Sequence, residues 1–240
     1  MLISIITPTF NRPERLAKTI ASLRGQTYSY WEHIIVDDGD GQGKYLADSL
    51  GDSRIRAFQN PKKGQTPARN FAITESKGEV IALLDDDDWF DDPFHLEKIA
   101  LLLNHGPALV HRYGWIVRED GDKRDWQVFN LPASAESLRK DNSILTSSMA
   151  YPKAFHEELG LFDEVIGGYF DWDWIIRVLD AGHPIKTIES PGVCYAVHGG
   201  NGSSQVHGER RTRSFQAFCK KHGLELEIKN HEVLLEEKTS

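Results

Sequence analysis

The sequence has few cysteines and no long apolar segment. Its two cysteines, Cys194 and Cys219, are too few for a disulfide framework and lack the spacing of a zinc site. No window approaches the length of a membrane-spanning helix, and the N-terminal residues lack the basic and apolar regions of a signal peptide. We therefore expect reduced thiols and a cytoplasmic protein without a membrane span, although peripheral contact with a membrane stays open.

Positive charge is also scarce. The 28 lysines and arginines are outnumbered by 36 aspartates and glutamates, which gives a formal net charge of −8. This balance argues against a nucleic-acid partner, so a phosphate-bearing ligand would need a local cation or a metal ion. The length of 240 residues allows one large domain with a substantial core.

The turn after the first expected strand contains no glycine. Residues 2–7 read as a buried strand that leads into Pro8 and Thr9 rather than into a glycine-rich phosphate loop. This argues against a dinucleotide-binding oxidoreductase and against a sugar-phosphate nucleotidyltransferase. An EF-hand is a poor match too, because Phe90 and Asp91 stand where the calcium loop needs a ligand and a glycine.

Strands and helices alternate through the first half of the chain. Apolar, β-branched runs predict strands at residues 2–7, 33–36, 55–58 and 80–84. Asn11 and Glu14 have the spacing of a helix capping box, and Asp92 with Pro93 predicts the N-cap and first residue of a later helix. This order predicts a mainly parallel α/β sheet, which binds ligands at the carboxyl ends of its strands.

The pattern changes after about residue 105. Residues 109–118 and 126–129 flank a turn and predict antiparallel strands. Further elements are expected as strands at 147–151 and 192–198, a helix at 171–179, a glycine- and serine-rich loop at 199–204, and one or two amphipathic helices beyond 205. We expect one domain over residues 1–204 and a helical appendage over 205–240 that packs on it or mediates homo-oligomerisation.

Six carboxylates fall within eight residues at the end of the fourth expected strand. Asp85 to Asp88 follow the apolar run, and Asp91 and Asp92 come next. Adjacent carboxylates repel each other, so some would stay protonated without a compensating cation. A hard divalent ion favours oxygen ligands and leaves coordination sites for phosphate oxygens. The run alone is also compatible with a solvated loop, but a strand that aims it at one point favours a cation site.

Several segments together resemble the inverting glycosyltransferases of family 2, which have the GT-A fold. In order along the chain they are residues 5–12, 36–39, 68–70, 84–89 with 96–98, and 171–174. The resemblance implies transfer of a sugar from a nucleoside-diphosphate sugar to an acceptor hydroxyl, with Mn²⁺ or Mg²⁺ on the diphosphate. It makes residues 1–105 the nucleotide-binding half and 106–204 a smaller, antiparallel acceptor-binding half.

The resemblance also implies which residues bind the donor. The metal-binding motif of the family falls on Asp85, Asp86 and Asp87, with Asp87 on the metal and Asp86 on the ribose. For Asp85 and Asp88, capping of the loop or support of the binding residues is as compatible with the sequence as direct contact with the donor. Thr7, Pro8 and Thr9 match the family's turn that borders the nucleobase. Asp38 matches the carboxylate that accepts a hydrogen bond from the nucleobase, and Arg69 matches a cation near the nucleobase or diphosphate.

A carboxylate at residue 38 suits an imide N–H such as that of uracil, so we expect UDP, while dTDP has the same imide and GDP stays open. The sugar is not indicated by the sequence. The acceptor also stays open among a glycan, a lipid-linked saccharide and a small molecule. Any of these would place the protein in polysaccharide or glycan biosynthesis.

The general base implied by the resemblance is an aspartate at the start of a helix. Asp171 matches this position, and Asp173 is the alternative. Phe170 stands where the family usually has an acidic residue, and this departure leaves open a non-catalytic nucleotide-sugar binding or assembly module. Among Trp89, Trp172 and Trp174 we expect no more than one to stack on a sugar.

His198 is expected either as a metal or diphosphate ligand or as a structural residue. Relatives have a histidine or a polar loop after the final strand, and neutral imidazole is a competent ligand for Mn²⁺. The glycine- and serine-rich loop that follows resembles a lid that orders when nucleotide binds.

Overall fold

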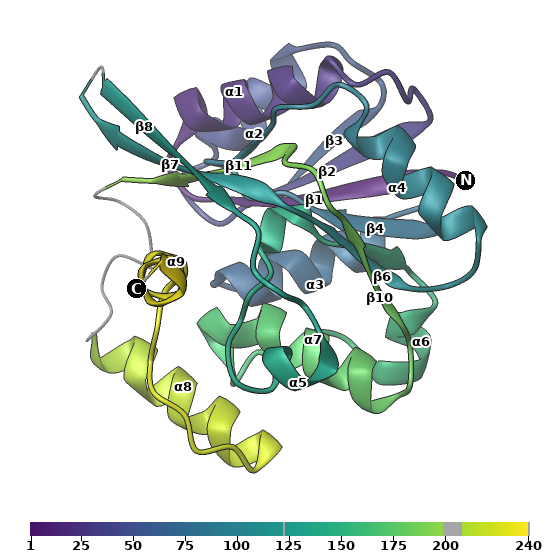
Figure 1. Cartoon of the computed structure of the whole chain (residues 1–240). Coiled ribbons are helices and arrows are strands. Elements are labelled where there is room, and N and C mark those ends of the chain that lie inside the picture. The colour runs from purple at the N-terminus through teal and green to yellow at the C-terminus, as the bar shows by residue number, and fades with distance from the viewer. Residues whose placement is uncertain (122, 199–207, 240) are drawn as a thin grey trace.

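The computed structural model describes residues 1–121, 123–198 and 208–239. Its centre is a seven-stranded sheet in which β9 runs antiparallel to both neighbours and the other pairs are parallel. Across the sheet (Figure 1) the strands are β10 (Ile185–Ile188), β6 (Leu109–Arg112), β9 (Ala150–Pro152), β4 (Val80–Leu83), β1 (Ile3–Thr9), β2 (Trp31–Asp37) and β3 (Ile55–Gln59). The expected mainly parallel α/β sheet is thus confirmed.

A smaller sheet is formed by four strands from distant parts of the chain. In order they are β5 (Trp89–Phe90), β11 (Val193–Val197), β7 (Gly114–Asp120) and β8 (Lys123–Phe129). β7 and β8 form the antiparallel pair that the sequence predicted. β11 pairs with β7 in parallel and with β5 antiparallel, so the two residues that follow the aspartate run are joined to the start of the last strand.

Helices cover both faces of the large sheet (Figure 1). One face is covered by α1 (Pro13–Arg24), α2 (Gln42–Ser49) and α4 (His95–Asn104). The other is covered by α3 (Gln65–Glu75), α5 (Ala135–Leu138), α6 (Phe155–Leu159) and α7 (Phe170–Asp180). Successive residues of a strand point to opposite faces, so Ile5 packs in the first layer and Ile6 in the second. Burial on both faces explains why these strands read as continuous apolar runs.

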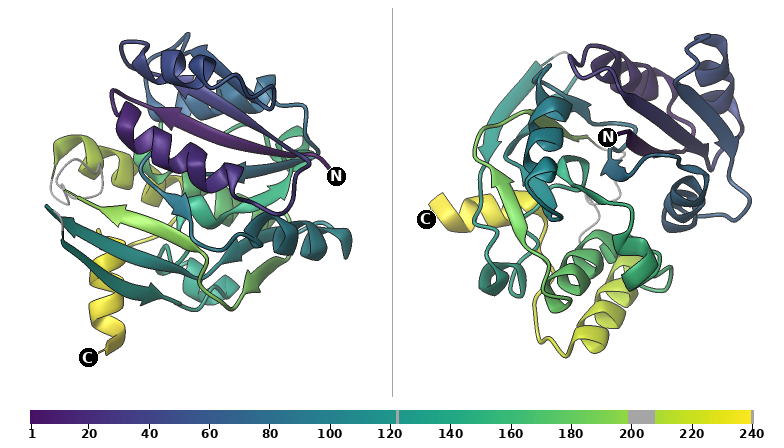
Figure 2. Two further views of the ribbon diagram at one scale, coloured as in Figure 1. Left: turned by 90° about the horizontal axis from the view of Figure 1, so that it is seen from above. Right: turned by 90° about the vertical axis from the view of Figure 1, so that its right-hand side faces the viewer.

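The C-terminal segment forms two helices, α8 (Glu209–His222) and α9 (His231–Thr239). The first packs on the start of α7, where the rings of Phe218 and Trp172 stack at a centroid distance of 4.5 Å. Leu234 and Leu235 of α9 pack against the smaller sheet and its flanking segments. Through these contacts both helices pack on the rest of the chain. The N-terminus and α9 lie at opposite ends of the molecule (Figure 2).

Two predicted helix starts are wrong. Asn11 does not cap α1, because it adopts a left-handed backbone with φ of 52° and its Oδ1 accepts from the amide of Asp40 at 2.9 Å. α4 begins at His95 rather than at Pro93, and the Oδ2 atom of Asp92 also pairs with Arg112 at 2.7 Å. At Asn11 a bond to a residue distant in sequence replaces the predicted local cap, whereas Asp92 keeps a local bond, because its Oδ1 accepts from the amide of Phe94 at 2.9 Å.

The segment predicted as one strand over 109–118 divides between the two sheets. β6 joins the large sheet and β7 the smaller one, and Gly114 begins β7. A Cβ atom on Gly114 would lie 2.6 Å from both Leu145 and the carbonyl oxygen of Val193, so only glycine fits where the chain crosses. The predicted strand at 147–151 is a short 3₁₀ helix, η1 (Thr146–Ser148), followed by β9, and α2 was not predicted.

Within the described residues, none of the helices combines the length and the apolar character that crossing a membrane requires. Cys194 and Cys219 are both free thiols, as expected.

Candidate active site

A cavity of about 990 Å³ opens at the carboxyl ends of β1, β2 and β4. This volume is at the upper end of the range of roughly 300–1,000 Å³ for ligand pockets. Its walls come from the strand ends, from the start of α3, from the start of α7, and from the C-terminal segment around α8 and α9. Among the expected site residues it is lined by Pro8, Asp38, Arg69, Asp85, Asp86, Asp87 and Asp171.

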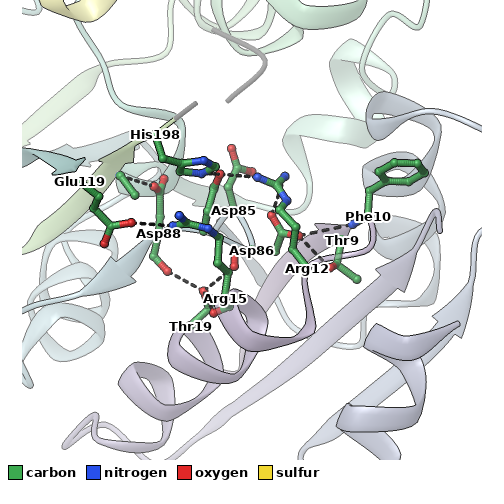
Figure 3. Close-up of polar contacts among 12 residues, drawn as sticks. Thr9, Phe10, Arg12, Arg15, Thr19, Asp85, Asp86, Asp88, Glu119 and His198 are labelled. Carbon is green, nitrogen blue, oxygen red and sulfur yellow. Dashed lines mark hydrogen bonds and ion pairs between the residues drawn. The ribbon is translucent and has the colours of Figure 1, made fainter. Parts of the chain in front are cut away.

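The centre of the aspartate run is neutralised by an arginine. The two guanidinium nitrogens of Arg12 lie 2.9 Å from Asp86 Oδ1 (Figure 3) and 2.5 Å from Asp87 Oδ2. Burial raises the pKa of Asp86 to about 6, with the charge of Asp87 adding to this and that of Arg12 opposing it. For Asp87, burial is outweighed by the His198 hydrogen bond and the Arg12 charge, which together lower its pKa. The structure thus supplies a cation from the protein itself.

Asp88 points away from the cavity. Its Oδ2 accepts from the hydroxyl of Ser147 at 2.5 Å and its Oδ1 accepts from the amide of Ala196 at 2.9 Å. Burial and the charge of Asp87 raise the pKa of Asp88 well above its ordinary value. The hydroxyl of Thr19 lies 2.7 Å from the carbonyl oxygen of Asp88, so α1 also fixes the backbone of the run (Figure 3). Asp88 therefore holds the run, η1 and β11 together.

The residues expected around the base differ in their access to the cavity. Asp38 lines it, and its carboxylate accepts from the amide of Gly64 at 3.0 Å and from the side chain of Asn60 at 2.7 Å. Thr7 and Thr9 are buried and donate to Leu84 O and Asp86 Oδ2, each at 2.7 Å. Their hydroxyls are thus used inside the protein, and of this turn Pro8 faces the cavity.

Arg69 is a buried cation on the cavity wall, only 1 % exposed. Its Nη2 pairs with Asp85, and its Cζ lies 4.2 Å from the ring centroid of Phe170. Among the described residues, its Nε and Nη1 have no hydrogen-bond partner. Buried donors are nearly always satisfied, so this arginine is suited to an anion that enters the cavity.

Asp171 and Asp173 have different surroundings although both lie in the first turn of α7. Asp171 lines the cavity, and its Oδ2 accepts from Thr146 at 2.8 Å and from Asn142 at 3.0 Å. Burial raises its pKa, and these hydrogen bonds oppose the rise. Within the described chain no cation pairs with it directly.

Asp173 faces away from the cavity wall and is fully buried beside an arginine, a lysine and a histidine. Its carboxylate lies 2.9 Å from Arg177, 2.7 Å from Lys221 and 2.9 Å from His222. Two of these partners belong to α8, so Asp173 joins the C-terminal helix to α7. Arg177 reaches Asp173 from one turn further along the same helix.

His198 lies at the end of β11 (Figure 3), and its Nε2 lies 3.0 Å from Asp87 Oδ2. The expected glycine- and serine-rich loop at 199–204 lies outside the described residues. In the described residues, no three histidine, cysteine, aspartate or glutamate side chains are arranged to hold a metal ion. The Asp87 and His198 pair nevertheless fits one whose remaining ligands are phosphate oxygens, which is how Mg²⁺ and related ions are commonly bound.

Sequence reasoning missed several residues of the cavity wall. Arg12 lies inside the first matching segment, but its partners are more than seventy positions away. Asn142 and Thr146 carry no motif, and their role appears only through their bonds to Asp171. The C-terminal segment contributes Arg210, Arg211, Ser214, Lys229 and Asn230.

The tryptophans flanking the motifs are largely packed into the protein. Trp174 is fully buried, and Lys18 covers the ring of Trp89 with its Nζ 3.0 Å from the centroid. Trp172 donates from Nε1 to the carbonyl oxygen of Leu138 at 2.6 Å, and of the three it is the one that reaches the cavity wall.

Comparison with known proteins agrees with this architecture. The uncharacterized glycosyltransferase YwdF of Bacillus subtilis is 33% identical over 246 residues, which cover 99% of this chain and 90% of that protein. S. aureus TarS in complex with UDP-GlcNAc has a TM-score of 0.72 at 16% identity, over 92% of this chain and 66% of that chain. This chain thus spans slightly less than two thirds of the TarS chain.

A mannosyltransferase, PcManGT from Pyrobaculum calidifontis in complex with GDP-Man and Mn²⁺, has a TM-score of 0.67 at 18% identity, over 92% of this chain and 63% of that chain. These likenesses confirm the expected GT-A fold. The sequence profile of "Glycosyl transferase family 2" matches residues 4–159, and by this match together with the full-length relative the chain belongs to glycosyltransferase family 2.

Proposed function

We propose that this protein is an inverting glycosyltransferase that moves a sugar from a UDP-sugar to an acceptor hydroxyl. The observation that carries the proposal is that one cavity is lined by Asp38, Arg69, Asp87 and Asp171, which come from four separate segments. This reaction requires four parts: a carboxylate that accepts from the nucleobase, a cation for the diphosphate, a metal-binding carboxylate, and a general base for the acceptor hydroxyl.

In the proposed complex, Asp38 accepts from the imide of the base and Pro8 borders it. Asp86 lies on the ribose side, and Arg69 faces the diphosphate with its unpartnered nitrogens. Thr9 acts indirectly, because its hydroxyl orients Asp86. The donor half is then residues 1–105, and the wall formed by the described residues between 106 and 198 with α8 and α9 faces the acceptor.

In the proposed chemistry, Asp171 takes the proton of the acceptor hydroxyl as its oxygen attacks the anomeric carbon. The bond from that carbon to the diphosphate oxygen breaks on the opposite face, so the configuration inverts. Burial raises the pKa of Asp171, which makes it a stronger base than an exposed aspartate. A divalent ion, Mn²⁺ or Mg²⁺, held by Asp87 and His198 would stabilise the negative charge of the leaving diphosphate.

The alternative is a nucleotide-sugar binding module without catalysis. Phe170 in place of the usual acid is the feature that favours it. Asp171, however, keeps a hydrogen-bonded place on the cavity wall, whereas a lost base would be under no constraint to do so. We therefore prefer the enzyme, and we expect it to act in the cytoplasm on a glycan, lipid-linked or small-molecule acceptor.

A thermal-shift screen tests the nucleotide assignment. We expect UDP with Mn²⁺ to raise the melting temperature more than ADP, whose base has no imide N–H for Asp38, while dTDP and GDP test the alternatives left open. A ligand at 100 times its Kd stabilises the native state by about 2.7 kcal/mol. Uridine, which lacks the diphosphate, is the matched control. If no nucleoside diphosphate shifts the melting temperature with metal present, the proposed function is wrong.

Arg12→Gln tests whether Arg12 competes with the metal ion. Because its guanidinium occupies Asp86 and Asp87, its removal is expected to strengthen Mn²⁺ binding about tenfold, as one positive charge leaves the site. Isothermal titration calorimetry measures the affinity. Arg15→Gln is the control, because Arg15 lies three residues further on, in the first turn of α1, but pairs with Glu119 at 2.8 Å (Figure 3). Weaker Mn²⁺ binding in Arg12→Gln would show that Arg12 supports the site instead.

A further inference from the structure

Phe170 lies directly against the cation of the cavity wall. Its ring faces the guanidinium of Arg69 at 4.2 Å, and both side chains line the cavity while remaining almost fully buried. Phe162 packs edge-on against the Phe170 ring at a centroid distance of 5.0 Å. The Phe170 ring is thus held in place by Phe162 of the core and also contacts the Arg69 guanidinium.

The hydrogen bonds of Arg69 are incomplete. A guanidinium has five N–H donors, and here Nη2 pairs with Asp85 while Nε and Nη1, which carry three donors, have no partner in the described residues. An aromatic face attracts the positive charge but leaves donors in the guanidinium plane unused. Phe170 therefore holds Arg69 without consuming the donors that an anionic ligand would need.

We propose that Phe170 is a positioning residue that keeps Arg69 available to the diphosphate of the ligand. This inference rests on the proposed function for the identity of the ligand. An acidic side chain at residue 170 would pair with Arg69 and compete with phosphate oxygens. It would also place a second negative charge beside Asp171, whose pKa is already raised by burial. Phe170 thus marks a different way of presenting the cation rather than a loss of function.

The effect on Asp171 follows from the same geometry. The charge of Arg69 is among the influences that lower the pKa of Asp171. If Arg69 were paired with an acidic side chain at residue 170, the lowering of the Asp171 pKa by the Arg69 charge would be partly cancelled. Phe170 therefore leaves one cation to serve both Asp85 and Asp171 as well as the ligand.

The test is calorimetric binding of inorganic pyrophosphate and of UDP, both with Mn²⁺, to three variants of the full chain. Phe170→Glu is expected to lose affinity for both ligands roughly tenfold or more, the effect of removing a charge-assisted contact. Phe170→Leu, which stays apolar but offers no ring face, is expected to lose about threefold, and Phe170→Tyr to stay within about twofold of the wild type.

Phe162→Leu is the matched control. Phe162 packs on the Phe170 ring, but within the described residues its ring makes no cation–π contact with Arg69. It is expected to lower the melting temperature and leave both affinities unchanged. Equal affinities for wild type and Phe170→Glu, with a folded variant, would overturn the inference, as would a loss in Phe162→Leu matching that in Phe170→Leu. Pyrophosphate binding that depends on Phe170 in a protein that binds no nucleotide would support the inference and overturn the proposed function.

Discussion

Replacement of Asp171 by asparagine is expected to abolish donor turnover while UDP still binds. Loss of a general base typically costs about 10²–10⁴-fold in rate. Asparagine keeps the size of the side chain and can still accept from Thr146 or Asn142, so the cavity keeps its shape. The measurement is the rate of UDP release from the donor, with UDP affinity determined in parallel by calorimetry.

Asp173→Asn is the matched control, two residues further along the same helix. Its carboxylate faces Arg177, Lys221 and His222 rather than the cavity. We expect a stability loss of about 1–3 kcal/mol, limited because the cations Arg177 and Lys221 remain partly exposed, and turnover close to the wild type. Wild-type turnover in Asp171→Asn, or an equal loss of turnover in a folded Asp173→Asn, would make the base assignment wrong.

Replacement of Asp87 by asparagine is expected to remove the response to Mn²⁺. Asp87 is the carboxylate that lines the cavity next to His198, and its lowered pKa keeps it ionised for a metal ion. Stabilisation of a leaving group by a metal ion is worth several kcal/mol, so turnover is expected to fall roughly 10³-fold. Calorimetric titration with Mn²⁺ and turnover across a Mn²⁺ series measure the two effects, and chelation of the wild-type protein should reproduce them.

Asp88→Asn tests whether the effect belongs to Asp87 or to the whole run. Asp88 is buried, and its pKa is raised well above the ordinary value, so a neutral amide is a close replacement. Its partners Ser147 and Ala196 are structural. The Mn²⁺ response should therefore survive in this variant. If Asp88→Asn loses the response and Asp87→Asn keeps it, the metal ligand has been assigned to the wrong carboxylate.

The donor side of the site follows closely from the sequence. Each strand is a short apolar run that ends at polar residues, and parallel strands present their carboxyl ends at one edge. Asp38 and Asp85 to Asp87 therefore had to lie near each other once the strands were placed, and the structure has them on one cavity wall. The local pattern failed where a distant contact replaced a local one, as at Asn11.

The sequence by itself determined the α/β alternation, the family and the position of the acidic run at a strand end, because these depend on periodicity and on motifs of adjacent residues. Only the tertiary structure separated Asp171 from Asp173. Both lie at the start of one helix, and a rotation of about 100° per residue turns them to different sides. Which side faces the cavity is decided by α8, which packs on the other side and brings Lys221 and His222 to Asp173. Such pairing across some fifty residues leaves no trace in the local pattern.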